Sequence, residues 1–500
     1  MSNVVKQSFL NVLSVIGAFA IGALNTVVLY PRIIGVQFYG IVIILLAQSN
    51  ILQPIFSFGL QHTVIKYFSA ASSTKEKDKL LLFSVLLPLC IIVPSALFFS
   101  FYYTEISTYL SSKNPGLAAY IYLIFVIAVT TSYFEIFYSW SRVQKRTVVG
   151  NFMKEVYQRV LIFVLLVAYF MQWLDFSGFI NALIVGYVLR LLIMMGYSLW
   201  LYTPKIHFEF PTNTSSLLSY TLLIFLSAFG ASVIIDIDAS MLGKLVEEQY
   251  VAYYKVAIFI AAIIDAPGRA LFQIVSPMVA EALNKNDRLG LKQLLRKSST
   301  NLLLVSGLFF VLINSNIHDL YALIYQLNAK EGFVLAIPVV FYISSTKLIS
   351  ALIGCTNNII TNSKYYYVVP FLSIGSAAAV IGLNLVFVSE IGFVGAALST
   401  FLVITVFNLI KVAFVWWAYK IVPWGKDSLV ILMLITVLLV PFYFWQLPFE
   451  PLVNMVIKGG LTSLLYLFFS YQFKLSDNIN ALMDKGIKKL ESVVRNTDSN

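Results

Sequence analysis

The chain contains 500 residues, of which 59% are hydrophobic and only 11% are charged. A soluble globular domain has roughly 45–50% apolar and about 25% charged residues, so this composition excludes an ordinary soluble protein. Long apolar runs recur from one end of the sequence to the other, and a bilayer-spanning helix needs roughly 20 such residues. The composition therefore predicts a polytopic membrane protein.

Hydropathy and loop signals predict an all-α protein with about fourteen transmembrane helices, because backbone groups in lipid must be hydrogen-bonded within each helix. In chain order, the first seven spans lie near residues 11–30, 41–60, 80–101, 118–140, 156–173, 179–201 and 217–238. The second seven lie near residues 250–271, 300–315, 333–355, 366–388, 395–417, 428–445 and 452–473. The first span continues through Leu29, which is too long for the apolar region of a cleaved signal peptide.

Lysine and arginine are divided unequally between the two sides of the predicted spans. Twenty-three lie in the tails and alternate loops, against four on the opposite side: Arg32, Lys113, Lys244 and Lys330. Because loops rich in these residues stay in the cytoplasm, both termini are predicted to be cytoplasmic. The asymmetry also explains the net charge of +11 without a nucleic-acid partner. The tail after Phe473 is predicted to be either a cytoplasmic amphipathic helix on anionic lipid or a solvated helix end.

Cysteine and histidine give no sign of a metal site, a disulfide framework or a reactive thiol. Cys90 and Cys355 lie far apart inside apolar runs, as small apolar residues do. The three histidines, His62, His207 and His318, are scattered without ligand spacing. We therefore expect no metal, no cofactor and no catalytic residue.

The sequence repeats itself at a spacing of 212 to 214 residues. Three pairs share this offset: residues 29–38 with 241–250, Pro54 with Pro267, and residues 178–182 with 392–396. A six-helix repeat keeps the same orientation in both copies, and it predicts halves at residues 1–210 and 211–420 related by a pseudo-twofold axis along the membrane normal. Residues 421–473 then form two additional helices, and residues 474–500 form the cytoplasmic tail. Transporters built this way bind substrate between the repeats and alternate its access to the two sides.

A family resemblance rests on the two copies of one short element. LYPRIIGVQFYGI at residues 29–41 resembles the R-x-L-G-x-x-x-Y-G element of bacterial polysaccharide exporters. These are the O-antigen-type lipid-linked oligosaccharide flippases of the multidrug/oligosaccharidyl-lipid/polysaccharide exporter superfamily. Residues 247–250 resemble the second copy of the element. The first copy departs from the family pattern because Val36 and Gln37 stand in place of an acidic pair, and the second because Ala252 stands in place of a glycine. The resemblance implies a flippase of the bacterial inner membrane, with lipid-linked oligosaccharide and membrane lipids as partners, and it leaves other polysaccharide-assembly proteins open as further partners.

Seven basic residues fall inside the predicted spans, where an ionised side chain costs roughly 2.5–3.5 kcal/mol and needs a partner or a watery cavity. Arg190 and Lys347 lie near the middle of their spans, which favours a substrate-binding cavity over a structural ion pair. Arg269 follows Asp265 by four residues, a spacing that suits an in-helix ion pair, so this pair is either structural or part of a substrate or coupling site. Outside these seven, the loop residue Arg32 is a candidate at the cavity mouth on the family resemblance alone. Four others are predicted to snorkel to an interface: Arg159, Lys255, Lys411 and Lys458.

Carboxylates inside the spans are candidates for ion coupling, because a membrane-buried acid can take up a proton or bind sodium. They are Glu135, Asp236, Asp238 and Asp265. Asp236 and Asp238 are predicted to lie near the outer interface, where a solvated carboxylate needs no special role. Asp265 therefore ranks first.

The family resemblance implies a flippase that carries a polyprenyl-pyrophosphate-linked oligosaccharide across the bacterial cytoplasmic membrane, and the sequence repeat is typical of alternating access. The basic excess inside the spans suits an anionic cargo. A cation-coupled multidrug antiporter and a lipid II-type flippase of the same superfamily stay open as alternatives. A membrane glycan polymerase or other enzyme is disfavoured, because the longest outer loops, near residues 102–117 and 316–332, are short and His318–Asp319 is their only adjacent histidine–carboxylate pair.

Overall fold

A computed structural model describes residues 17–71, 73–207, 209–328 and 331–476, together with residues 480 and 484. Within these ranges every regular element is a helix, and twelve helical segments are long and apolar enough to cross a membrane. Two shorter apolar helices, Gly17–Ile33 and Tyr157–Phe170, stand where the first and fifth spans are predicted. The all-α polytopic membrane fold is therefore confirmed, while the total of fourteen spans stays a prediction. Most of the predicted amphipathic tail lies outside the described residues.

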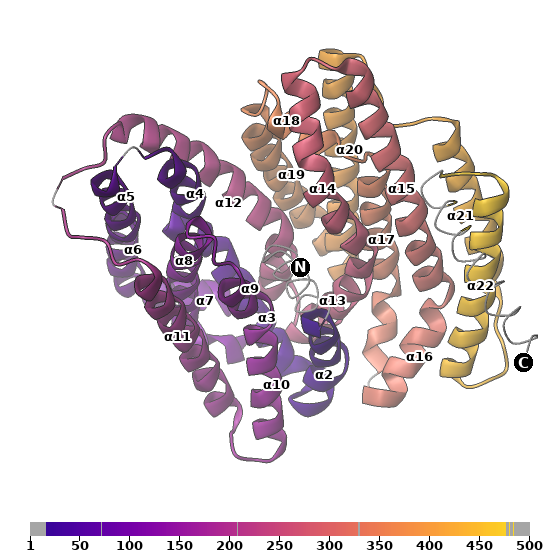
Figure 1. The fold of residues 1–500 in the computed structure, drawn as a ribbon. Helices are drawn as coiled ribbons and strands as arrows, with labels where there is room; N and C mark the ends of the chain where they lie inside the picture. Colours follow the sequence, from indigo (N-terminus) through magenta and orange to yellow (C-terminus); the bar gives the residue numbers. More distant parts are fainter. Residues whose placement is uncertain are drawn as a thin grey trace, which may run out of the picture. The chain divides into compact units, whose positions relative to one another are not determined.

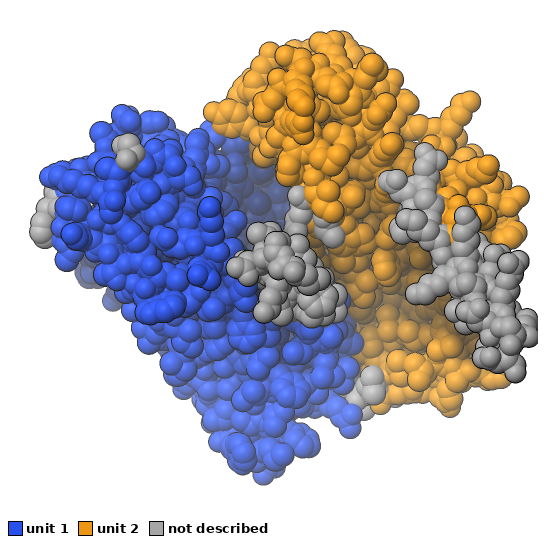
Figure 2. Space-filling model, in the orientation of Figure 1, with its two compact units in different colours: residues 1–256, 370–396 blue, residues 257–369, 397–500 orange. Residues whose placement is uncertain are grey.

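Packing divides the chain into two compact units (Figure 2). Unit 1 contains residues 1–256 and 370–396, and unit 2 contains residues 257–369 and 397–500. The units follow packing, whereas the predicted halves follow the sequence repeat, so the boundaries at residues 210 and 420 stay a prediction.

Unit 1 is built around one central helix (Figure 1). Its helices are η1 (Leu24–Leu29), α2 (Tyr30–Ile33), α3 (Gly35–Ser57), α4 (Leu60–Ala70), α5 (Thr74–Leu86), α6 (Leu89–Phe101), α7 (Tyr103–Leu110), η2 (Pro115–Tyr120), α8 (Tyr122–Val143), α9 (Val148–Glu155), α10 (Tyr157–Phe170), α11 (Phe176–Leu201), α12 (Thr214–Leu245), most of α13 (Glu248–Ala261) and most of α19 (Val368–Ile391). The central helix α8 packs against α3, α4 and α11. Aromatic side chains of α8, among them Phe134, Phe137 and Trp140, fill the core between these helices.

The second predicted span is interrupted by a turn in unit 1. Helix α3 ends at Ser57, and both Phe58 (φ 47°) and Gly59 (φ 72°) adopt the left-handed conformation before α4 begins. A Cβ atom at residue 59 would lie 2.9 Å from the backbone nitrogen of Phe225 in α12. Glycine is therefore required there both by its backbone conformation and by the close approach of α12.

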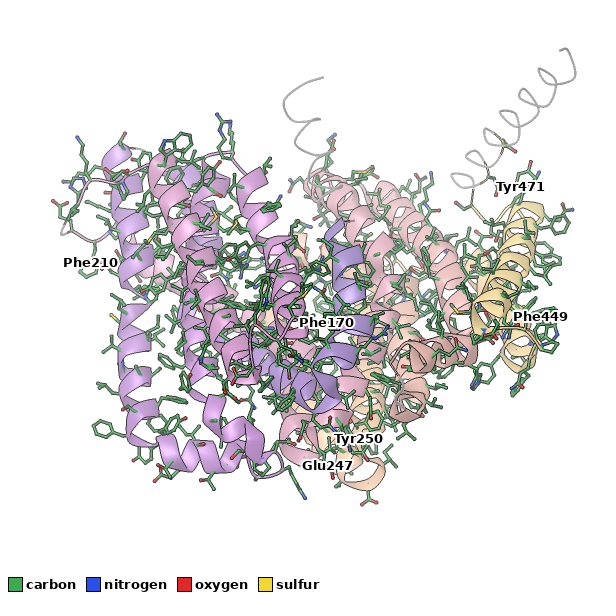
Figure 3. All side chains as sticks on the ribbon, turned by 90° about the horizontal axis from the view of Figure 1, so that it is seen from below. Phe170, Phe210, Glu247, Tyr250, Phe449 and Tyr471 are labelled. Atoms are coloured by element: carbon green, nitrogen blue, oxygen red, sulfur yellow. The ribbon has the colours of Figure 1, made fainter. Side chains whose placement is uncertain are left out.

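Unit 2 surrounds the long helix α15, and its two C-terminal helices lie side by side (Figure 1). Its helices are η3 (Ala262–Asp265), α14 (Ala266–Asn284), α15 (Arg288–Ser315), α16 (Ile317–Asn328), η4 (Glu331–Ala336), α17 (Ile337–Leu352), α18 (Thr356–Asn362), most of α20 (Phe393–Tyr419), α21 (Lys426–Phe444) and α22 (Pro451–Gln472). Helix α15 packs against α14, α17, α21 and α22. The exposed aromatic residues Phe449 and Tyr471 stand at the two ends of α22 (Figure 3), as expected for a helix that ends at the lipid headgroups.

Three loops or spans of unit 2 differ from their sequence predictions. The span predicted at residues 250–271 is broken by η3, because Pro267 cannot donate a backbone hydrogen bond and instead occupies the first turn of α14. The ninth span begins at Arg288 rather than near residue 300, since Asp287 caps the helix by accepting a hydrogen bond from the backbone of Gly290 at 2.9 Å. The loop predicted at residues 316–332 contains helix α16.

Candidate functional site

Arg190 is the most deeply buried of the predicted cavity cations. It lies on α11, and only 3% of its surface is exposed. Its Nε donates a hydrogen bond to the carbonyl oxygen of Met153 at 2.9 Å, and its guanidinium carbon lies 3.5 Å from the centre of the Phe134 ring. Among the residues that the structure describes, no carboxylate forms an ion pair with Arg190, and its buried Nη1 has no hydrogen-bond acceptor. The guanidinium is therefore fixed in orientation and keeps an unused donor.

Helix α8 places a carboxylate directly beside this arginine site. Glu135 follows Phe134 in the chain and forms an ion pair with Lys154 of α9 at 2.7 Å. Glu135 and Lys154 are both partly buried. We call Phe134, Glu135, Met153, Lys154 and Arg190 the α8–α11 cluster. Because it contains two cations and one carboxylate, the cluster has a net positive charge.

A second polar cluster of unit 1 contradicts the prediction for Asp236 and Asp238. Both lie on α12 and are buried, with 7% and 3% of their surfaces exposed, rather than solvated at an interface. Asp238 accepts hydrogen bonds from the Tyr254 hydroxyl at 2.5 Å and from the Asn384 amide at 2.8 Å. The sequence suggested no partner for Asp238, because Asn384 lies 146 residues away.

The neighbouring carboxylate has polar surroundings of its own. The side chain of Asn50 forms a hydrogen bond with Asp236, and the positive charge of Lys255 interacts with it electrostatically. Lys255 therefore has a nearby counter-charge, so snorkelling is not needed to explain it. Two buried carboxylates on one helix, with amide, hydroxyl and ammonium partners, form a site at which a proton or a cation can change the charge balance.

The other predicted site residues lie apart from these clusters. Lys347 is half-buried on α17, and Arg32 on α2 is exposed. Asp265 is half-buried as the residue before α14, and Arg269 is exposed. No ion pair between Asp265 and Arg269 occurs in the described structure, so this predicted pair is wrong. The physical reason is η3, which interrupts the regular helix on which a four-residue spacing would bring the two charges together.

Unit 2 contains a buried ion pair that sequence reasoning missed. Lys458 on α22 is only 2% exposed, and its Nζ lies 3.0 Å from Oδ2 of Asp319 on α16. Asn454, one turn before Lys458, donates to Oδ1 of the same carboxylate at 2.9 Å. The predicted snorkelling of Lys458 is therefore wrong. Asn454 and Lys458 are four residues apart and therefore lie on one face of α22. This pair of polar residues in an apolar span was the sequence signal for a buried polar partner.

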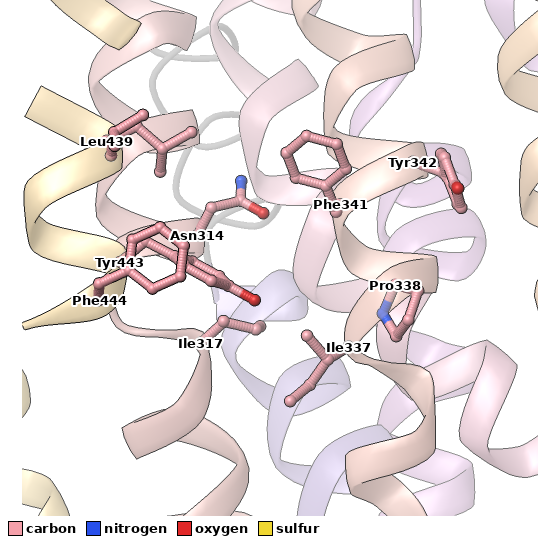
Figure 4. A pocket seen from close by; sticks show the side chains of 10 residues that line it. Asn314, Ile317, Ile337, Pro338, Phe341, Tyr342, Leu439, Tyr443 and Phe444 are labelled. Carbon is pink, nitrogen blue, oxygen red and sulfur yellow. The ribbon is translucent and has the colours of Figure 1, made fainter. Parts of the chain in front are cut away.

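Each unit also contains a mainly apolar pocket. In unit 2, α15, α17 and α21 enclose about 440 Å³, lined by residues such as Asn314, Phe341 and Tyr443 (Figure 4). In unit 1, α3, α6, α7, α8 and α12 enclose about 630 Å³, with Gln48 and Ser240 among the few polar residues of its lining. Neither lining contains a charged residue, so these pockets suit hydrocarbon rather than an anionic head group.

Comparisons with known proteins give a family and a fold. The model of a family described as polysaccharide biosynthesis protein matches residues 4–283. No curated protein matches the chain. The structure of the lipid II flippase MurJ in an inward closed conformation is similar, with a TM-score of 0.71 and 15% identity over 94% of this chain and 100% of that chain.

Two MATE transporters have a similar architecture. An inward-facing multidrug resistance MATE family transporter of the MOP superfamily gives a TM-score of 0.59 at 14% identity, over 84% of this chain and 94% of that chain. The MATE transporter VcmN of Vibrio cholerae gives a TM-score of 0.56 at 14% identity, over 83% and 95% of the two chains. At these identities the structures establish the fold alone, whereas the family model covers more than half of the sequence. The chain belongs to the polysaccharide biosynthesis protein family, as its repeated element predicts, and has the fold of the MurJ and MATE transporters.

Proposed function

We propose that this protein is a flippase that moves a polyprenyl-pyrophosphate-linked oligosaccharide across the bacterial cytoplasmic membrane, by alternating access, for the synthesis of a surface polysaccharide of the O-antigen type. The observation that carries the proposal is the match of residues 4–283 to the polysaccharide biosynthesis family. The MurJ-like fold supports a transporter rather than an enzyme. The proposal accordingly assigns no catalytic residue.

An anionic pyrophosphate requires cations that are not already neutralised by carboxylates. Arg190 supports this role best, because it has no described ion-pair partner and its Nη1 lacks an acceptor. Stacking on Phe134 and the bond to Met153 hold the guanidinium in one plane, and a planar guanidinium presents paired donors to phosphate oxygens. Lys347, Arg269 and Arg32 are the further candidates for the anion.

Ion coupling is assigned first to Asp238. A proton or sodium ion at this buried carboxylate would compete with the hydrogen bonds from Tyr254 and Asn384 and would thereby change the local packing. Asp236 ranks second because it is also buried. Asp265 ranks third as a half-buried residue, and Glu135 ranks last because Lys154 already pairs with it.

A cation-coupled multidrug antiporter is the second candidate function. Two of the similar structures are MATE transporters, and the buried pair Asp236 and Asp238 offers the acidic site that a cationic cargo requires. A lipid II-type flippase is the third, on the likeness to MurJ. Its pyrophosphate cargo would use the same cations, so only the identity of the glycan separates it from the leading proposal.

The test is complementation of a deletion strain of the host of origin. We expect the deletion to abolish the surface polysaccharide, and the wild-type gene to restore it. Arg190→Met should fail to restore it at equal protein level, whereas Lys426→Met, which removes an exposed lysine at the start of α21, should succeed. Normal polysaccharide combined with raised sensitivity to cationic drugs would contradict the flippase and favour the antiporter.

A further inference from the structure

The two copies of the repeated sequence element touch each other inside unit 1. A Cβ atom added at Gly40, in the first copy, would lie 1.9 Å from the backbone oxygen of Glu248, in the second copy. A Cβ atom at Gly243, on the other side of this contact, would lie 2.5 Å from Cγ1 of Ile44. Gly40 therefore lets α3 approach the backbone of Glu248, and Gly243 leaves room for the side chain of Ile44, with no space for a larger residue at either glycine. We call this contact the glycine seam.

Asn114 closes the seam from a third segment, the turn between α7 and η2. Its Nδ2 donates to the carbonyl oxygens of Gly243 at 2.5 Å and Val246 at 3.1 Å, and its Oδ1 accepts from the backbone nitrogen of Glu248 at 2.8 Å. Only 1% of Asn114 is exposed. Nearby, Nζ of Lys244 lies 3.3 Å from the centre of the Tyr109 ring of α7, which ties the same two segments together.

The groups bonded by Asn114 are those that a helix end leaves unpaired. Gly243 and Val246 lie at the C-terminal end of α12, and Glu248 is the first residue of α13, so their carbonyls and amide lack partners within a helix. Glu247 of this turn and Tyr250 in the first turn of α13 lie close together (Figure 3). Water can take over these bonds when the contact separates. The seam is therefore a contact that can open without leaving backbone groups unsatisfied.

We propose that Asn114 is a positioning residue for transport, which holds the glycine seam closed on the predicted outer side and releases it when that side opens. The proposal rests on the proposed alternating-access function, because a static protein would have no need to open this contact. The seam joins the two sequence repeats, and repeats that rock against each other must separate at one side of the membrane. It contains hydrogen bonds and close glycine contacts rather than an ion pair, so closed and open arrangements can be close in free energy.

The experiment measures the accessibility of the seam from outside the cell. The two cysteines of the sequence are removed first, Cys90 by replacement with serine and Cys355 by replacement with alanine. Ile44→Cys then places one thiol at a fully buried position beside Gly243. A membrane-impermeant maleimide then labels intact cells. We expect slow labelling in this background and at least roughly tenfold faster labelling with Asn114→Ala added, because the substitution removes three hydrogen bonds, each with a modest net contribution.

Two matched controls separate opening of the seam from general loss of structure. Asn314→Ala removes an equally buried amide, whose bonds go to Phe310 and Ser344 within unit 2, and should leave the labelling rate unchanged. Gly40→Ala should raise labelling as Asn114→Ala does, whereas Gly382→Ala, where an added Cβ meets nothing within 4 Å, should not. Folding of each variant is checked by size-exclusion chromatography in detergent.

The outcomes distinguish this inference from the proposed function, because labelling needs no knowledge of the cargo. Unchanged labelling in folded Asn114→Ala and Gly40→Ala proteins would overturn the inference and make the seam a static helix contact. An equal rise with Asn314→Ala would overturn it as well, since the effect would then be general destabilisation. A rise confined to the seam variants in a protein that exports drugs rather than glycans would support the inference and contradict only the assigned cargo.

Discussion

The buried ion pair between Lys458 and Asp319 should make Lys458→Met strongly destabilising. The substitution leaves the Asp319 carboxylate, only 16% exposed, without its counter-charge. Breaking a buried pair by removing one partner costs roughly 3–5 kcal/mol. We expect about 3 kcal/mol, the lower end, because Asn454 still donates to the carboxylate at 2.9 Å. Each kcal/mol lowers the melting temperature by roughly 2–4 °C in chains of 150–250 residues, and by about half as much in a chain of 500 residues because the unfolding entropy grows with length. The expected drop is therefore about 3–6 °C.

The assay is thermal unfolding of the purified protein in one detergent, followed by tryptophan fluorescence and by size-exclusion chromatography after heating. Lys426→Met, at an exposed lysine, is the control and should change stability by less than about 0.5 kcal/mol. The double substitution Lys458→Met with Asp319→Leu should recover most of the loss, because it removes both charges together. A Lys458→Met protein as stable as the wild type, or a double variant no better than the single one, would refute the assignment of a buried pair.

Three further predictions concern the clusters and the connection between the two sequence halves. Arg190→Lys should reduce export nearly as much as Arg190→Met, since an ammonium cannot both stack on Phe134 and keep the planar donor set; an active lysine variant in the complementation assay would contradict this. Asp238→Asn should remove the dependence of transport on the coupling ion while leaving the folded protein intact, measured as uptake into vesicles with and without an imposed gradient; an unchanged ion dependence would move the coupling site elsewhere. Hydrogen bonds from Lys79 and Lys75 lower the pKa of Glu209, in the connection between α11 and α12, from 4.5 to about 2. The stability from these contacts is therefore complete above about pH 4.5 and is lost as the pH falls toward 2. Glu209→Gln should accordingly speed proteolysis of this connection at neutral pH, and an equal cleavage rate in both proteins would argue against the contact.

The features that could be predicted from the sequence are those carried by neighbouring residues. Apolar runs identified the chain as a membrane protein. They also located the twelve helical segments of the described structure that are long and apolar enough to cross a membrane. The repeated element at residues 29–41 identified the family that the match to residues 4–283 confirms. Pro267 cannot donate a backbone hydrogen bond, and the structure breaks its span at η3, just before this residue. Each of these signals lies within one helix or one turn.

What could not be predicted depends on partners that are distant in the sequence. The sequence predicts Lys458 at an interface because it lies near the outer end of its span, whereas its partner Asp319 lies 139 residues away. The sequence likewise predicts Asp238 near the outer interface, and its amide partner Asn384 lies 146 residues away. For Arg190 the sequence shows a charge inside an apolar span, but the stacking on Phe134 could not be predicted, because it depends on how α8 packs against α11.

The most direct test of the flippase assignment is the leaflet occupied by the lipid-linked glycan in a deletion strain. Spheroplasts are treated with a membrane-impermeant glycan-oxidising reagent, and the lipid-linked oligosaccharides are then extracted and scored as oxidised or protected. We expect the glycan to accumulate on the cytoplasmic side, protected from the reagent, and the wild-type gene to restore its exposure to the reagent. Normal exposure of the glycan on the outer leaflet in the deletion strain would contradict the assignment.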